Sequence, residues 1–590
     1  MNRSRATWWR VLALLAVLGL VAAACGDDDG GGDDTSSDTS APDDTSDTTD
    51  GGGGDGDGPA PAYGGTVVVG LEAESNTWTP GPAQLANSGL MVAMAIYDPL
   101  MSLNENGEFE PFLAESLEPN DDLTEWTMTL REGVQFHDGT PLDAETIVWN
   151  FETLHFTPDS QTYGTLIAAG VDEANPIEAL DERTVVYRLS EPNAAFPDML
   201  RGEAGWPISR TAYEANPEGF GDAPVGTGPF VMEQWTRDDR AVLVRNDNYW
   251  MTAPNGDELP YLDGLEFRPI TDEDSRTASL SSGDVQMVQT LRGSAVKQVL
   301  ELVDAGGFES SLHVGNNSGS AILNVLEPPL DDVRIREALA LASDSEQVQV
   351  VLGDDGLTEV STGFFSEDSP WYSETAAAAY PTERDVEAAT ALVDDYKNDP
   401  ERSDGKAPGD DVVVTYACPP DPSLIAVSQL QQELWQEAGV VVELAQVEQA
   451  THISNAVGSA DTDPPYRGNF SINCWRAGGG EGDPLTSLQS FFGPVAETPG
   501  NFTNYTNEEI DEQLEILQTS PDFADRYAAV ERISIITAEE FPILWSSPTP
   551  TIVGYRDDIH GVTDWTLPSG SMGTGTPGAV ARFHQVFMAE

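Results

Sequence analysis

Of all parts of the sequence, the segment from Asp411 to Leu444 constrains the fold of this chain most strongly. A valine-rich run leads into a helical pattern over 423–438, and Gly439 ends that helix before a second valine-rich run begins. A strand, a helix and a second strand within so short a stretch form a β-α-β crossover, which requires two parallel strands. The sequence therefore predicts a layered α/β fold.

Strand and helix signals alternate along the rest of the chain from Tyr63 onward, without a fixed repeat. Residues 66–70 predict a strand, Asp143 is suited to cap a helix, and Asp331 and Asp332 open another. At 590 residues the chain exceeds what one hydrophobic core usually serves, so we expect two or more lobes. The apolar positions expected on the inner faces of the two helices are Ile147, Phe151 and Leu154, then Ile335, Ala338, Leu339 and Ala342.

The charge balance is strongly acidic and excludes one class of function. The sequence carries 101 acidic residues against 27 basic ones, a formal net charge of −74. A polyanion of this size repels nucleic acid phosphates, so we expect no nucleic-acid partner.

The N-terminus has the pattern of an export signal. Arginines near the start precede an apolar run over 11–24, which would measure roughly 21 Å as a helix and is short for a membrane core of about 30 Å. Small residues then lead directly to Cys25, which resembles the lipobox of bacterial lipoproteins, with Ala22 where leucine is usual. We expect 1–24 to be a lipoprotein signal peptide and Cys25 to carry the lipid that anchors the protein extracytoplasmically to the cell membrane. An ordinary signal peptide with a chance cysteine is the alternative.

Residues 25–62 consist almost wholly of Asp, Gly, Ser, Thr, Pro and Ala. Such a segment buries too little apolar surface to offset its chain entropy, so we expect it to be disordered. As a flexible coil it would span roughly 33 Å, which suits a tether for a folded body. Its Asp-x-Asp-Gly spacings lack the terminal Glu of a calcium loop, so we do not expect calcium to bind there.

Two cysteines, Cys418 and Cys474, follow Cys25 in the sequence. Each comes after a run with strand character, at 411–417 and 469–473, and an exported protein folds in an oxidising compartment. We predict that they form a disulfide, which would stabilise the fold by up to about 4 kcal/mol. Two buried free thiols are the alternative.

A series of sequence blocks occurs in a fixed order over most of the chain. They cover 111–116, 126–131, 134–141, 224–230, 245–250, 259–263 and 327–338. In order and spacing they resemble the bacterial extracellular solute-binding proteins of family 5, which are peptide- and nickel-type substrate-binding lipoproteins of ABC transporters.

The resemblance implies an α/β, two-lobed periplasmic-binding-protein-like fold that closes on a solute in a cleft between the lobes. It implies lobe I with an extra subdomain over 63–315, lobe II over 316–545, and a C-terminal return to lobe I over 546–590. Chain breaks near 315–319 and Pro542 suit the two crossings between lobes. It also implies a monomer that delivers peptides or peptide-like solutes to an ABC permease and ATPase, without catalysis.

Two turns within these blocks have explanations that need no ligand. Gly226 and Gly228 are expected to adopt positive φ in a tight turn that Pro229 ends. Asp138 and Gly139 are expected to turn the chain between a short strand and the helix that follows. We assign all of these residues to the scaffold.

Peptide-binding members of the family hold the peptide amino terminus with an acidic residue shortly after a tryptophan. Trp475 matches that tryptophan, but Gly478 stands at the position of the acid. Glu481 or Asp483 would substitute if the glycines between them let a carboxylate fold back. Asp483, which precedes a proline, also matches the start of the family's next helix, which is the structural alternative for it.

The remaining binding candidates are polar or aromatic residues that structural roles would also explain. Arg476 offers a planar fork for a ligand carboxylate or phosphate, although a surface ion pair would explain it equally. Asn316 and Asn317 offer amide hydrogen bonds at the proposed crossing, or form a simple turn. The resemblance places three further residues at strand ends facing the cleft, although most of the 13 tryptophans must belong to the core. These three residues are Glu74, Trp78 and Trp545.

Sequence features of metal sites and of enzymes are sparse. The six histidines are scattered, with no pair at i and i+4, so we expect no protein-held metal and no cofactor. We find no Gly-x-Ser-x-Gly, His-Glu-x-x-His or phosphate loop, which makes an exported hydrolase the function with the least support. The sequence leaves open a carrier for a sugar, an opine or a nickel chelate, and a ligand-sensing receptor lipoprotein.

Overall fold

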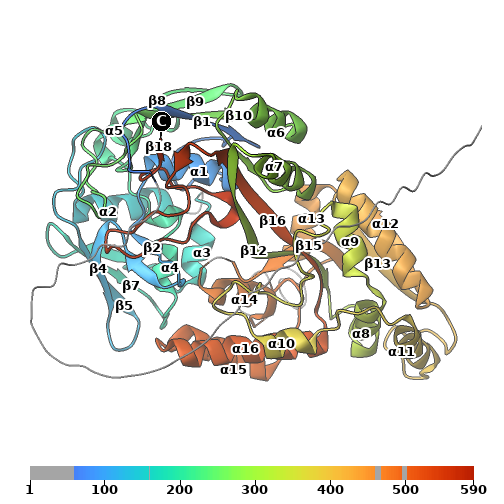
Figure 1. Ribbon diagram of the computed structural model, residues 1–590. Helices are drawn as coiled ribbons and strands as arrows, with labels where there is room; N and C mark the ends of the chain where they lie inside the picture. Colours follow the sequence, from blue (N-terminus) through green and yellow to red (C-terminus); the bar gives the residue numbers. More distant parts are fainter. Residues whose placement is uncertain (1–58, 158–159, 459–466, 481, 495–500, 590) are drawn as a thin grey trace, which may run out of the picture. The chain divides into compact units, whose positions relative to one another are not determined.

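The computed structural model describes residues 59–157, 160–458, 467–480, 482–494 and 501–589. The expected signal peptide, Cys25, nearly all of the expected tether and Glu481 lie outside these ranges. The described chain mixes helices and strands throughout, as predicted (Figure 1). No described helix combines the length and the apolar character that crossing a membrane requires.

A ten-stranded mixed sheet is built around two long strands, β12 (Phe308–Leu323) and β16 (Ile543–Arg556). These two pair antiparallel in the middle of the sheet, whose order is β14-β13-β15-β12-β16-β11-β1-β10-β9-β8. Strands from later in the chain therefore flank β12, and strands from earlier in the chain flank β16. The others are β1 (Thr66–Leu71), β8 (Phe230–Thr236), β9 (Arg240–Arg245), β10 (Gly264–Pro269), β11 (Met287–Thr290), β13 (Val412–Cys418), β14 (Val440–Gln446) and β15 (Ile472–Gly478).

The predicted β-α-β crossover is confirmed. β13 and β14 pair parallel, with Val412 opposite Val440, and helix α12 (Pro422–Glu437) connects them. The Asp421 side chain accepts hydrogen bonds from the first turn of α12 and so begins the helix. Gly439 follows the helix with a φ of +94°, a conformation that glycine adopts without strain.

The two predicted helix starts are also confirmed. Asp143 caps α2 (Ala144–Asn150), which continues as the π-helical turn η1 (Phe151–His155). Asp332 caps α8 (Val333–Ala342) by accepting from the backbone of Arg334. All seven apolar residues predicted for the inner faces of these helices are buried. The helix period in the sequence therefore located the core-facing side correctly.

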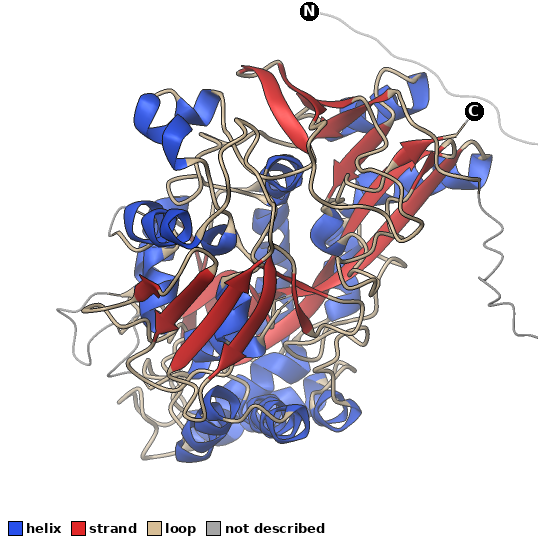
Figure 2. Ribbon diagram, turned by 90° about the vertical axis from the view of Figure 1, so that its left-hand side faces the viewer, coloured by secondary structure: helices blue, strands red, loops and turns tan. Residues whose placement is uncertain are grey.

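Smaller sheets and many short helices complete the body. A four-stranded sheet with the order β4-β5-β7-β6 lies in the foreground of Figure 2. The strands outside the main sheet are β2 (Met101–Leu103), β3 (Phe109–Pro111), β4 (Ala114–Pro119), β5 (Glu125–Leu130), β6 (Ile177–Ala179), β7 (Thr184–Arg188), β17 (Ile559–His560) and β18 (Phe587–Met588). The other helices are α1 (Asn87–Ile96), α3 (Tyr163–Ala168), α4 (Phe196–Met199), η2 (Glu203–Gly205), α5 (Arg210–Ala215), η3 (Phe220–Asp222), α6 (Glu273–Ser282), α7 (Gly293–Ala305), α9 (Ser345–Leu352), α10 (Glu374–Ala379), α11 (Val386–Asn398), α13 (Gln449–Val457), α14 (Pro484–Phe492), α15 (Glu508–Thr519), α16 (Phe523–Glu540) and η4 (Pro577–Ala579).

The buried apolar residues form separate clusters on the two sides of the β12–β16 pair. One cluster takes almost all of its members from 321–545, and Ala195 is its one contribution from earlier in the chain. The other clusters combine residues from 67–299 with residues from 552–587. The C-terminal segment thus packs with the first half of the chain rather than with the residues that immediately precede it.

The break expected at 315–319 coincides with a register shift inside β12, and the strand continues through it. One other local prediction was wrong in its physical reason. Gly226 and Gly228 do not have positive φ. They are needed because the backbone of Ile96 lies against them: a Cβ at Gly226 would lie 2.2 Å from the Ile96 carbonyl oxygen. Gly139 lies in the expected turn with a φ of +81°, although the predicted short strand before it forms only an isolated bridge.

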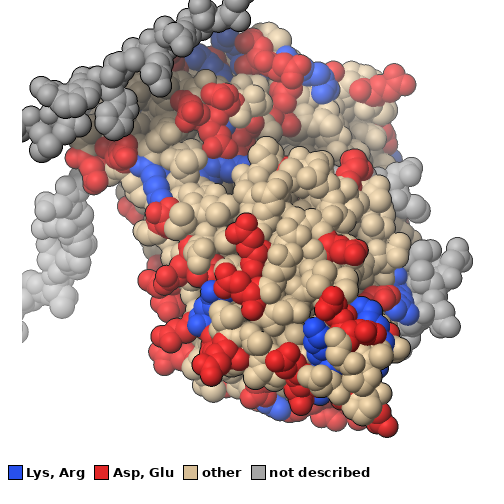
Figure 3. Space-filling view, turned by 90° about the vertical axis from the view of Figure 1, so that its right-hand side faces the viewer, with Lys and Arg blue, Asp and Glu red and all other residues tan. Residues whose placement is uncertain are grey.

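Acidic side chains outnumber basic ones on the face shown in Figure 3. Individual basic residues therefore contact several carboxylates. Arg334 lies within 3.0 Å of carboxylate oxygens of Asp332, Asp395 and Asp399. Most basic residues in the described ranges form an ion pair with at least one carboxylate, which makes a buried cation outside such a pair noteworthy.

Candidate ligand-binding site

A cavity of about 310 Å³ lies between segments that are far apart in the sequence. Helix α1, strand β2 and the turn after β2 line one part, and the C-terminal segment 565–582 lines another. The bulged part of β12, the loop 366–371 and Gly482 supply the rest of the wall. This volume is at the lower end of the range for small-molecule sites, so the cavity suits a small solute.

Asn316 on β12 positions two of these wall segments. Its Oδ1 accepts hydrogen bonds from the backbone N–H and the hydroxyl of Ser366, both at 3.0 Å. Its Nδ2 donates to the carbonyl oxygen of Gly480 at 2.7 Å. One buried amide therefore fixes the loop 366–371 and the glycine-rich stretch after β15 against the middle of the sheet.

The C-terminal wall is fixed to the first half of the chain in a similar way. Asn87 at the start of α1 donates to the carbonyl oxygen of Gly578 at 2.8 Å. Thr576 and Ser311, on β12, share a hydrogen bond of 2.7 Å between their hydroxyls. The cavity wall at 565–582 is thus held by both α1 and β12.

The acidic side chains that line the cavity are more exposed than the arginines that line it. Glu105 and Asp368 are exposed, so they lie where the cavity meets solvent. Arg582 is only 8% exposed, and Arg201 is intermediate. Arg201 donates from Nε to Asp198 at 2.8 Å. The cavity is therefore acidic at its exposed edge and basic where it is buried.

Asp98 provides the carboxylate that interacts with Arg582. It is 2% exposed and accepts hydrogen bonds from the Tyr249 hydroxyl at 3.0 Å and from Trp250 Nε1 at 2.8 Å. Burial raises the pKa of Asp98 to about 7, and the hydrogen bonds and the charge of Arg582 oppose that rise. Burial lowers the pKa of Arg582 to about 10, so this guanidinium stays protonated at neutral pH.

Two of the nine predicted binding residues, Asn316 and Asn317, line the cavity. Asn316 is buried and uses its amide to hold neighbouring segments, whereas Asn317 is exposed. Gly478, which stands at the position that the resemblance implied for an amine anchor, pairs with Asn317 across β15 and β12. A Cβ at Gly478 would lie 1.8 Å from the Asn316 carbonyl oxygen, so no side chain fits at that position.

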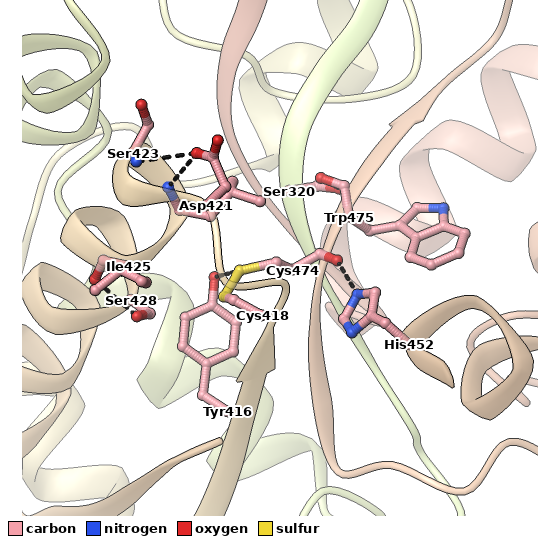
Figure 4. The surroundings of a disulfide bond; sticks show 11 residues. Ser320, Tyr416, Cys418, Asp421, Ser423, Ile425, Ser428, His452, Cys474 and Trp475 are labelled. Atoms are coloured by element: carbon pink, nitrogen blue, oxygen red, sulfur yellow. Dashed lines mark hydrogen bonds between the residues drawn. A yellow bond between two sulfur atoms is a disulfide. The ribbon is translucent and has the colours of Figure 1, made fainter. Parts of the chain in front are cut away.

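Trp475 and Arg476 on β15 lie outside the cavity lining. The Trp475 ring is half-buried and packs against His452, with ring centroids 5.8 Å apart (Figure 4). It also packs against Phe502, at a centroid distance of 5.2 Å. Arg476 is exposed, and no hydrogen bond or ion pair links its guanidinium to a residue in the described ranges. The expected surface ion pair of Arg476 is therefore not formed with a described partner.

Asp483 begins a helix, which is the structural role that the sequence offered as the alternative to ligand binding. Its carboxylate caps α14 by accepting from Leu485 N and binds Arg526 Nη2 at 2.8 and 2.6 Å. Burial raises the pKa of Asp483, and the charge of Arg526 opposes that rise. Because both carboxylate oxygens are buried and engaged, Asp483 is not available for a ligand amine. Glu481 lies outside the described residues.

Glu74, Trp78 and Trp545 have scaffold roles. Glu74 accepts hydrogen bonds from Trp235 Nε1 at 3.1 Å and from the Asp238 backbone at 2.8 Å. Trp78 is 2% exposed and Trp545 is 4% exposed, each inside a hydrophobic cluster. None of the three lines the cavity.

Cys418 and Cys474 form a disulfide in the structure (Figure 4). The two strands that carry them, β13 and β15, pair parallel with Ala417 opposite Asn473, so the cysteines are the next pair along the ladder. The Tyr416 hydroxyl lies 3.2 Å from the Cys474 sulfur. The disulfide thus links neighbouring strands on the β12 side of the sheet.

Three parts of the cavity were not predicted from the sequence: the C-terminal segment, the loop 366–371 and the arginines. One feature of the sequence could have indicated that Arg582 is functional: it is a single charged residue within the apolar stretch 579–583. Among the residues that the structure describes, no group of three His, Cys, Asp or Glu side chains is placed to hold a metal ion.

The sheet, the two long shared strands and the cavity fit the two-lobed α/β fold of periplasmic-type binding proteins. The family model for bacterial extracellular solute-binding proteins, family 5 Middle, matches residues 108–498. The chain belongs to this family.

Individual relatives agree with this assignment. The glutathione-binding protein GsiB of Salmonella paratyphi A is 29% identical over 297 residues, which cover 50% of this chain and 55% of GsiB. The chain thus spans about half the length of the curated relatives it matches. Helicobacter pylori DppA, solved with the peptide STSA, is 20% identical, covers 90% of this chain and 99% of its own, and has a TM-score of 0.69. AgaA from A. tumefaciens R10, solved with agropinic acid, is 22% identical, with 89% and 99% covered and a TM-score of 0.69. These two likenesses show the fold.

Proposed function

We propose that this protein is the extracytoplasmic substrate-binding component of an ABC importer, and that it captures a small peptide or peptide-like solute in the cavity. The observation that carries the proposal is the cavity itself, which is lined by segments from both sides of the β12–β16 pair. The protein performs no catalysis in this account. It presents the bound solute to a permease, and an ATPase supplies the energy for transport.

The long shared strands suit a hinge. Lobe I is proposed to cover 63–315, lobe II 316–545, and the return to lobe I 546–590. The register shifts in β12 fall between Val314 and Ser320, next to the proposed boundary, and a disrupted ladder bends more readily than a regular one. Closure around a solute excludes water, which strengthens the hydrogen bonds and ion pairs inside the cavity.

A peptide-like solute is favoured because the cavity offers both signs of charge. A short peptide carries an amine at one end and a carboxylate at the other. The exposed Glu105 and Asp368 suit the amine, and the more buried Arg201 and Arg582 suit the carboxylate. The relatives named for glutathione support the same class, because glutathione is itself a peptide-like acid. An opine, a sugar or a nickel chelate is the alternative cargo.

In this proposal the N-terminal segment determines where the protein is located in the cell envelope. Signal cleavage and acylation at Cys25 would anchor the protein to the outer face of the cell membrane. The tether 25–62 would then hold a monomeric body clear of that surface. These assignments rest on the sequence pattern alone.

Thermal melting with a ligand panel tests the proposed function. The panel contains glutathione, trialanine, a sugar, an opine and nickel–histidine, each added to protein freed of co-purified solute. A true ligand at a hundred times its Kd should stabilise the fold by about 2.7 kcal/mol. Stabilisation by the two peptides and not by the others supports the proposal, and a response to only a non-peptide solute contradicts it.

A cavity-filling variant tests whether the stabilising ligand binds in the cavity. Leu90 on α1 lines the cavity, so Leu90→Trp should remove ligand stabilisation while it leaves the unliganded protein folded. Leu326 is 37% exposed and lies outside the lining, so Leu326→Trp is the matched control and should behave like wild type. Equal ligand responses in the two variants would place the binding site elsewhere.

A further inference from the structure

Arg582 is a buried cation without a hydrogen-bonded partner among the residues that the structure describes. It is 8% exposed and lines the cavity. No hydrogen bond or ion pair joins its guanidinium to any described residue. Two aromatic rings flank it instead, with the Trp565 centroid 5.0 Å and the Phe112 centroid 5.5 Å from the guanidinium carbon.

The other buried arginines show how unusual this is. Each donates hydrogen bonds from its guanidinium to carbonyl oxygens, hydroxyls or carboxylates. Arg276 donates to Gln289 O, Arg336 to Leu330 O and Glu540, Arg402 to Asp404, and Arg526 to Asp483. An arginine carries five N–H donors, and burying them unpaired is costly. Arg582 therefore lacks a partner that the rest of the protein regularly supplies.

The surrounding charges do not neutralise Arg582. Asp98 is the carboxylate that acts on it electrostatically, but the Asp98 oxygens already accept from Tyr249 and Trp250. Arg201 lies nearby and is paired with Asp198 at 2.8 Å, and His584 is held neutral by burial, which lowers its pKa. Among the described residues, the Arg582 guanidinium is therefore left without a carboxylate that accepts its hydrogen bonds.

We propose that Arg582, assisted by Arg201, binds a carboxylate of the solute in this cavity, so that the ligand is a small carboxylic acid. This inference deepens the proposed function and rests on it. The guanidinium fork matches a carboxylate in two parallel hydrogen bonds. Trp565 and Phe112 flank the fork and restrict its rotation, which limits the entropy lost on binding. A carboxylate there supplies the partner that Arg582 lacks.

The direct test compares a peptide acid with its amide on the full-length wild-type protein. Isothermal titration with trialanine and with trialanine amide changes only the carboxylate. We expect the acid to bind at least tenfold more tightly than the amide. Citrate, a carboxylic acid without a peptide backbone, and inorganic phosphate are titrated in parallel to separate carboxylate from general anion binding.

Variants then assign the preference to Arg582. Arg582→Gln should remove the preference for the acid, and Arg582→Lys should keep part of it because the charge remains without the fork. Arg237→Gln is the matched control, since Arg237 also stacks on a tryptophan, Trp235, at 4.0 Å but lies outside the cavity lining. Melting of each variant without ligand shows whether it is folded. If Arg582→Gln does not fold, the acid–amide comparison on wild type decides the question.

The outcomes separate this inference from the proposed function. If acid and amide bind wild type equally, or if folded Arg582→Gln keeps the preference, the carboxylate site is overturned while peptide binding stands. If citrate binds in an Arg582-dependent manner and neither peptide form binds, the carboxylate site stands and the peptide function fails. Binding of phosphate in preference to every carboxylate overturns the assigned chemistry. If no probe binds, both proposals fail.

Discussion

Asp98 illustrates how burial alone creates a pH-sensitive group in this protein. Desolvation raises its pKa to about 7 from the ordinary value of 3.8. Because the folded-state pKa exceeds the unfolded value, folding favours the protonated acid. Its contribution to stability is thus full below about pH 4 and is lost as the pH rises through 7.

We predict that Asp98→Asn removes this loss. The variant and wild type should have similar free energies of unfolding near pH 4, and the variant should gain relative to wild type as the pH approaches 8. The gain is at most about 4 kcal/mol, because each pKa unit corresponds to about 1.36 kcal/mol. Urea denaturation at both pH values measures it, with exposed Asp304→Asn as the control. Parallel pH profiles for Asp98→Asn and wild type would contradict the account.

Most single residues that the sequence singled out have structural roles, for reasons that a sequence does not display. Trp78 stacks edge-on against Trp235, and Trp545 packs on Phe364, with ring centroids at 5.3 and 4.8 Å. These partners are remote in the chain, so periodicity could not reveal them. Arg582 is the converse case, because its lack of a partner is visible only once its neighbours are known.

At the scale of elements, the close approach of helix α1 to the Gly226–Gly228 turn predicts that a larger residue at Gly226 destabilises the fold. A Cβ at Gly226 would lie 2.2 Å from the Ile96 carbonyl oxygen, which belongs to the backbone and cannot move aside cheaply. We expect Gly226→Ala to cost about 3 kcal/mol in the free energy of unfolding. Gly202 has open space within 4 Å and a negative φ, so Gly202→Ala is the control and should be close to neutral. A small effect at Gly226 would mean that the turn separates freely from α1.

The disulfide between β13 and β15 is a second element-scale feature. Replacing both Cys418 and Cys474 by alanine should lower the free energy of unfolding by about 2–4 kcal/mol, because the unfolded chain loses its constraint. A reductant should produce a similar drop in wild type and no drop in the double variant. If the reductant leaves the wild-type unfolding curve unchanged, the cysteines are not linked in solution.

Elements set by local pattern were predictable, and elements set by long-range pairing were not. The β-α-β unit and the helices after Asp143 and Asp332 follow from spacing, caps and Gly439, which are all local. The stretch 315–319 looked like a break because its small polar residues disfavour an isolated strand. Pairing with both β15 and β16 overrides that preference and continues β12 through it.

At the scale of the whole molecule, the hydrophobic clusters that the described residues form all lie at or beyond Val67. A protein that begins at Tyr63 should therefore fold with an unchanged melting temperature and should bind solute as the full chain does. Circular dichroism melting and ligand titration of the two forms measure this. A lower melting temperature or weaker binding in the shorter form would show that the tether contributes to the body.

The central claim is that the cavity holds a peptide-like solute, and native mass spectrometry of the purified body tests it most directly. The native mass, compared with the denatured mass, reveals what the protein carries from the cell. We predict a 1:1 complex whose added mass corresponds to a short peptide or a peptide-like acid, and its loss in Leu90→Trp. A single non-peptide mass that survives the Leu90→Trp substitution would contradict both the ligand class and the site.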